Sequence, residues 1–228
     1  MKKTIIFLIL TVIISCHKYQ ERKKMISPKT ASGATAKQDI PEQDTISEKE
    51  IICDSVYQNK NYKIVLRHFS WEKSYEENDK NTVFIFSKKI HGKYQELFRD
   101  SIESHTGDYE FRDFNGDNIK DILIQNISDV RSNWTYYLYL VDLKNDRLTK
   151  VKNFNQIKNP NYLSKYNLID SQVISGRNWT SFYQIKKDTV FDFGYVIYDG
   201  EDENGKTVDF NKEYDKTLLK VLKNKNYK

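Results

Sequence analysis

Glycine, proline, cysteine and histidine are all scarce in this chain of 228 residues, which has eight, three, two and four of them. So little Gly and Pro excludes a collagen-like or Gly/Pro-rich chain, and no Gly-rich phosphate-binding loop occurs. The few Cys and His exclude a disulfide scaffold and disfavour a zinc site. Hydrophobic residues make up 38% of the chain and aromatic residues 14%, which is enough to build a core.

Recognisable catalytic motifs are also missing. The chain has no Gly-x-Ser-x-Gly, no His-Glu-x-x-His and no Ser-x-x-Lys with Lys-Thr-Gly. We therefore expect no enzyme, although 32 acidic residues leave an unrecognised hydrolase as an alternative. A formal net charge of +5 on this length is no nucleic-acid signature, so no nucleic-acid partner is expected.

The first sixteen residues have the features of an export signal. Lys2 and Lys3 precede an apolar run over 4–14 that is too short to span a bilayer. The run ends in Ile13-Ile14-Ser15-Cys16, which resembles the bacterial lipobox. That resemblance implies removal of a signal peptide, 1–15, and acylation of Cys16 with chains such as palmitate. It also implies a lipoprotein anchored in the lipid bilayer of the bacterial cell envelope and facing the periplasm.

Residues 16–50 are predicted to be a flexible tether, because they are polar and hold almost no large apolar residue after Ile26. The folded domain is expected to span 51–228. Its one cysteine, Cys53, lies in a strand-like stretch with no flanking base, which favours a small buried residue over a reactive thiol.

Most of 51–228 is predicted to be β-structure. Strand patterns occur over 62–67 and 82–86, and the run 136–141 is apolar on both faces, as in a central strand. Phe191, Phe193, Tyr195 and Ile197 share one face of a further strand, because they lie two residues apart. Turn signals separate these runs, so we expect a single all-β antiparallel domain. One helix is suggested by Leu218, Leu219, Val221 and Leu222, and no internal repeat is evident.

The clearest internal motif runs from Asp113 to Asp121. Asp113, Asn115, Asp117 and Asp121 place side-chain oxygens at positions 1, 3, 5 and 9, and the Ile119 carbonyl would supply position 7. Alternate oxygens in a tight loop are typical of Ca²⁺ sites. Asn118 stands where such loops usually have Gly, and Asn tolerates the left-handed backbone. We predict a structural Ca²⁺ that pins two strands; the alternative is a solvated Asx-rich turn without metal.

The segment 108–199 is similar to a known family. The similarity rests on Tyr109-Glu110-Phe111-Arg112 followed by the Asp-rich loop, then Asp121-Ile122-Leu123, Tyr137-Leu138-Tyr139, Asn159-Pro160-Asn161-Tyr162, Ser175-Gly176 and Phe182-Tyr183. This order resembles periplasmic lipoproteins related to the immunity proteins against peptidoglycan-cleaving effectors of type IV secretion. The resemblance implies a small β-propeller-like fold, a Ca²⁺ loop and kinship with lysozyme inhibitors. The alternative fold is a β-sandwich.

A second loop, from Ser175 to Trp179, is a candidate for partner binding. In an inhibitor, the Ser175 hydroxyl and the Arg177 guanidinium would pair with carboxylates of a hydrolase cleft, Gly176 would permit close approach, and Trp179 would anchor. The alternative is an ordinary β-turn with an exposed Arg.

The leading functional hypothesis is therefore inhibition of, or immunity to, a lysozyme-like peptidoglycan hydrolase by loop insertion into its cleft. The alternative is a glycan-binding or envelope-scaffold lipoprotein with a structural calcium loop, since the faces of its tryptophans could stack on sugars.

Overall fold

The computed structural model describes residues 45–58, 60–69, 80–201 and 205–227. All of these residues belong to one compact unit of the chain, Pro41–Lys228. The predicted signal peptide, Cys16 and most of the tether lie outside the described residues. Within the described part, no helix has both the length and the apolar character needed to cross a membrane.

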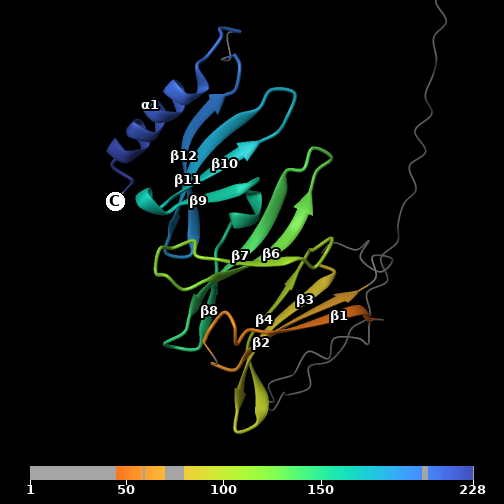
Figure 1. Ribbon diagram of the computed structural model, residues 1–228. Helices are drawn as coiled ribbons and strands as arrows, with labels where there is room; N and C mark the ends of the chain where they lie inside the picture. The colour runs from red at the N-terminus through yellow and green to blue at the C-terminus, as the bar shows by residue number, and fades with distance from the viewer. Residues whose placement is uncertain (1–44, 59, 70–79, 202–204, 228) are drawn as a thin grey trace, which may run out of the picture. The chain divides into compact units, whose positions relative to one another are not determined.

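The described residues form an all-β fold with one helix, as the sequence predicts (Figure 1). Twelve strands build three antiparallel sheets of four, and in each sheet neighbouring strands follow one another along the chain. The first sheet has β1 (Thr45–Ile52), β2 (Tyr62–Phe69), β3 (Thr82–Ile90) and β4 (Lys93–Ile102); the second has β5 (Tyr109–Arg112), β6 (Asp121–Ser128), β7 (Trp134–Asp142) and β8 (Arg147–Lys150); the third has β9 (Pro160–Leu163), β10 (Leu168–Val173), β11 (Trp179–Lys186) and β12 (Thr189–Tyr198). The short 3-10 helices η2 (Phe154–Gln156) and η3 (Ser164–Tyr166) flank β9, and the α-helix α1 (Phe210–Lys223) ends the chain.

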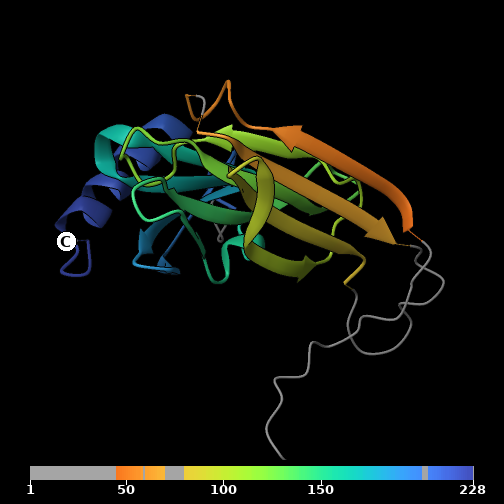
Figure 2. The same ribbon diagram turned by 90° about the horizontal axis from the view of Figure 1, so that it is seen from below.

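Each sheet has the four-stranded meander order of a propeller blade. The described strands close no barrel, and the propeller-like arrangement remains a prediction. In both views the first sheet and α1 lie at opposite ends of the described part (Figures 1 and 2).

The apolar core is divided into layers between successive sheets. Ile64 and Phe84 of the first sheet pack with Ile122 and Tyr139 of the second. The opposite face of the second sheet, which includes Leu138, packs against the third sheet. The second sheet is therefore buried on both faces, and this confirms the central strand predicted over 136–141.

Helix α1 covers the outer face of the third sheet. Asp209 caps its first turn by accepting a hydrogen bond from the Lys212 N–H. Leu218 and Val221 pack on the sheet with the apolar face of β12, whereas Leu219 is 55% exposed. The predicted helix is confirmed, but Leu219 lies off its apolar face because adjacent residues are about 100° apart around a helix.

The fold begins earlier than the predicted boundary at residue 51. Strand β1 starts at Thr45 and pairs with β2 as far as Ile52, with one irregularity in register between Thr45 and Ser47. Glu48 and Glu50 pair with Arg67 and Lys63, each at 2.6 Å. The tether prediction is wrong for 45–50, because backbone pairing with β2 and these ion pairs join this segment to the first sheet.

Candidate functional site

The Asp-rich loop joins β5 to β6, as predicted, and is closed by its own hydrogen bonds. Asp113 Oδ1 accepts the N–H groups of Asn115 and Gly116 at 3.0 and 2.7 Å, and Oδ2 accepts the Asn118 N–H at 2.9 Å. Asn118 has φ of 64°, the left-handed backbone expected at the position that usually holds Gly. Asp117 Oδ1 accepts the Ile119 N–H at 2.8 Å.

Asp121 lies at the base of this loop and is completely buried. Its Oδ2 accepts the Phe114 N–H at 2.8 Å and its Oδ1 the Val141 N–H at 3.1 Å. Burial raises the pKa of Asp121 to about 7; the two hydrogen bonds oppose this rise, and the charges of Asp117 and Asp113 add to it. Asp121 therefore links the loop to the second sheet, because it accepts hydrogen bonds from the backbone of both.

The loop also contacts the third sheet. The buried Phe114 ring lies 5.8 Å from the ring of Tyr162 on β9, and it meets Phe154 of η2 edge-on, with ring centres 5.3 Å apart. A Cβ at Gly116 would lie 2.9 Å from the hydroxyl oxygen of Tyr162 on β9, so the backbone of the loop passes close to this strand. Asp117 and its neighbours therefore sit in a loop that helps hold two sheets together.

The calcium prediction has the right donor type, since all predicted ligands are oxygens. Asn115 and Asp117 lie side by side, because Asn115 Nδ2 donates to Asp117 Oδ2 at 3.0 Å and the Asp117 N–H donates to Asn115 Oδ1 at 3.0 Å. Across the described residues, however, no group of three or more His, Cys, Asp or Glu is arranged to hold a metal ion. Calcium binding through these residues, the Ile119 carbonyl and Asp121 therefore stays a prediction.

Cys53 is fully buried, which confirms its predicted place in the core. Burial is the largest cause that raises the pKa of the Cys53 thiol to about 11. A thiol in this state is a poor nucleophile.

The predicted partner loop connects β10 to β11 and has an internally fixed turn. The Ser175 N–H donates to Asn178 Oδ1 at 3.0 Å, and the Ser175 hydroxyl donates to the Arg177 carbonyl. A Cβ at Gly176 would meet nothing within 4 Å, so no neighbour within the chain requires glycine there. Ser175, Gly176 and Arg177 thus share one turn, whereas Trp179 begins β11 and is half-buried opposite Tyr198.

Arg177 is held in one orientation. Its guanidinium carbon lies 3.8 Å from the centre of the Tyr198 ring, a cation–π contact. Its Nε–H and Nη2–H groups both donate to the Glu201 carbonyl oxygen, at 3.0 and 2.6 Å. Arg has five N–H donors in a planar fork. These hydrogen bonds use the Nε–Nη2 edge of the guanidinium. Arg177 also lines a hollow of about 390 Å³, together with the rest of the loop and with Asp199, Gly200 and Glu201.

The loop between β6 and β7, residues 129–133, lies on the same side of the sheets as the β10–β11 loop (Figure 1). Sequence reasoning missed it. Val130 is its fully exposed apolar residue, and Asn133 is buried. The available signal was one apolar residue in an otherwise polar turn, Ser128-Asp129-Val130-Arg131-Ser132.

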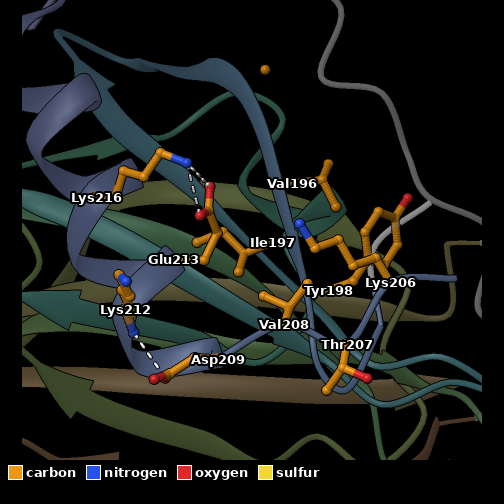
Figure 3. Close-up of a pocket in the computed structure, with 11 residues that line it drawn as sticks. Val196, Ile197, Tyr198, Lys206, Thr207, Val208, Asp209, Lys212, Glu213 and Lys216 are labelled. Atoms are coloured by element: carbon orange, nitrogen blue, oxygen red, sulfur yellow. Dashed lines mark hydrogen bonds and ion pairs between the residues drawn. The ribbon is translucent and has the colours of Figure 1, made fainter. Parts of the chain in front are cut away.

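A hollow of about 780 Å³ lies between β12 and the start of α1 (Figure 3). Val196 and Tyr198 come from the strand, and Lys212 and Lys216 from the helix. Lys216 pairs with Glu213 at 3.0 Å. This hollow combines apolar, phenolic and charged groups, and Tyr198 joins it to the Arg177 loop.

Comparisons with protein-family models, curated proteins and solved structures found no match.

Proposed function

We propose that this chain is a membrane-anchored protein of the bacterial periplasm that inhibits, or gives immunity to, a lysozyme-like peptidoglycan hydrolase. It would bind by inserting the β10–β11 loop into the cleft of that enzyme. The lipobox-like segment ending at Cys16 supports the anchor and the location, and the structural calcium would belong to the Asp113–Asp121 loop. The protein itself would have no enzymatic activity.

The orientation of Arg177 is the observation that carries this proposal. Glycoside hydrolases cleave with a pair of carboxyl groups in an open cleft. The Nη1–Nη2 edge of Arg177 has the planar geometry that matches one carboxylate with two parallel hydrogen bonds. Tyr198 and the Glu201 carbonyl already fix the guanidinium, so less side-chain entropy is lost when the partner binds.

Inhibition assays with the purified full chain test the proposal. Lysozymes of the different structural types would act on a peptidoglycan suspension, with Ca²⁺ and with EDTA. We expect stoichiometric inhibition of at least one type. Replacing Arg177 with Ala should weaken it by at least about 30-fold, because truncating one partner of a buried charge pair costs about 2 kcal/mol or more.

The Arg177→Lys variant tests the geometry, since lysine keeps the charge but lacks the planar fork. It should also weaken inhibition. Arg147→Ala is the matched control, because Arg147 is an exposed arginine at the other end of β7 from the β6–β7 loop. A folded wild-type chain that inhibits no enzyme of the panel would refute the proposal.

Glycan binding is the second candidate, and the exposure of Trp134, 38%, favours it. Sugar binding that is lost in Trp134→Ala or Trp179→Ala without loss of folding would support this alternative. Turnover of peptidoglycan by the chain alone would instead support a hydrolase.

A further inference from the structure

The β6–β7 loop carries an apolar residue that is fully exposed to solvent. Val130 is 102% exposed. Ile174, in the β10–β11 loop, is 48% exposed and Trp134, at the start of β7, is 38% exposed. Exposed apolar side chains that gather in one region are typical of protein-binding surfaces, whereas scattered ones are not.

The β6–β7 loop is also rigidly built. Asp129 Oδ1 accepts the N–H groups of Arg131 and Asn133 at 2.9 and 3.1 Å. The Ser132 N–H donates to the Asp129 carbonyl at 3.0 Å, and Lys158 pairs with the Asp129 carboxylate at 3.0 Å. Val130 and Arg131 are therefore presented on a closed turn whose own acidic charge is already paired.

The buried side chain of Asn133 joins this loop to the β10–β11 loop. Its Nδ2 donates to the Ile174 carbonyl at 2.8 Å, and its Oδ1 accepts the Ile174 N–H at 2.8 Å. The same Nδ2 donates to Asp129 Oδ2 at 2.8 Å. Because one amide spans both loops, Val130, Ile174 and Arg177 are carried on a single rigid support.

We infer that the two loops form one binding surface and that the β6–β7 loop enters the same enzyme cleft as Arg177. This inference rests on the proposed function. Val130 and Ile174 would pack on an apolar wall of the cleft, and Arg131 would add a second positive charge. A hydrolase cleft that carries two carboxyl groups complements the β6–β7 loop, because Arg131 of that loop is basic and its acid, Asp129, is paired with Lys158.

The same inhibition assay, with the full chain, tests this surface. Val130→Asp places a carboxylate on the loop tip, where it touches nothing within the folded chain, and it should weaken inhibition by at least about 30-fold. Ile174→Asp should act in the same direction. Leu219→Asp is the matched control, because Leu219 on α1 is 55% exposed, close to the value for Ile174, and lies away from the two loops. Its replacement should leave inhibition unchanged.

The outcomes separate the two claims. If wild-type chain inhibits and Arg177→Ala does not, but Val130→Asp inhibits like wild type, the second loop is no part of the surface and only this inference fails. If no enzyme is inhibited, both claims fail. If size-exclusion chromatography with light scattering shows a wild-type dimer that Val130→Asp dissociates, the loop joins two copies of the chain, and the inference is overturned.

Discussion

The buried Asp121 carboxyl should make the chain more stable at mildly acidic pH when no metal is present. Its pKa is about 7 in the folded chain, against 3.8 when it is free in solution. A group whose folded pKa is raised stabilises the fold fully below its unfolded pKa, and this contribution is lost as pH rises through the folded value. The window for Asp121 therefore runs from about pH 4 to pH 7.

The size of the effect follows from the two pKa values. Lowering the pH from 7.5 to 5.0 protonates Asp121 in the folded chain but not in the unfolded chain. By linkage, the free energy of unfolding should rise by about 2.5 kcal/mol. For a domain of this length, that corresponds to a melting temperature higher by roughly 5–10 °C.

Thermal unfolding of the full chain in EDTA, followed by circular dichroism at several pH values, measures this gain. His68 acts in the opposite direction, because burial lowers its pKa and protonation of His68 then costs stability. The comparison that isolates Asp121 is therefore the difference between wild type and Asp121→Asn, which keeps the His68 contribution.

The Asp121→Asn variant should lack the gain at acidic pH. Asp142→Asn is the control, since Asp142 also accepts two backbone N–H groups, from Lys144 and Asn145, but its pKa is lowered and it does not titrate in this range. A pH dependence in Asp121→Asn equal to that of wild type would refute the assignment.

Two further results are expected. Asp117→Asn keeps an acceptor for the Ile119 N–H but removes the charge of a predicted Ca²⁺ ligand, so its melting temperature in EDTA should be close to that of wild type. Millimolar Ca²⁺ should raise the melting temperature of wild type more than that of Asp117→Asn. Equal increases in the two proteins would contradict the calcium site. In a Cys16→Ser chain, Cys53 is the one remaining thiol. In the folded chain it should react with Ellman's reagent more than about 100-fold slower than after unfolding, because it is buried and its pKa is about 11. Rapid reaction of the thiol in the folded chain would contradict the buried position.

Local patterns were enough to predict much of the fold. The alternation of Phe191, Phe193, Tyr195 and Ile197 places them on one face of β12, and all four pack against the third sheet and α1. The Asp-rich loop lies between two strands because its Asx residues satisfy backbone groups locally. Each of these predictions depends on residues close together in the sequence.

The features that the sequence did not reveal depend on distant contacts. Residues 45–50 hold one large apolar residue, Ile46, so it is the pairing of β1 with β2 that shows that they belong to the fold. The three sheets repeat a four-strand order without an evident repeat in the sequence. Asn133 and Ile174 are 41 residues apart, so the bond that joins the two loops has no local signature.

The order of the strands has a consequence for how this chain reaches its folded state. Among the described residues, each strand forms its sheet with the strand before or after it in the sequence, and one isolated bridge joins Thr189 of β12 to Lys152. Each sheet can therefore form by closing short loops between neighbouring strands. Contacts between residues far apart in the sequence, which slow the folding of many β-proteins, form when completed sheets pack against one another. Such a chain can fold progressively from its N-terminal side as it emerges, with each completed sheet serving as the template for the next.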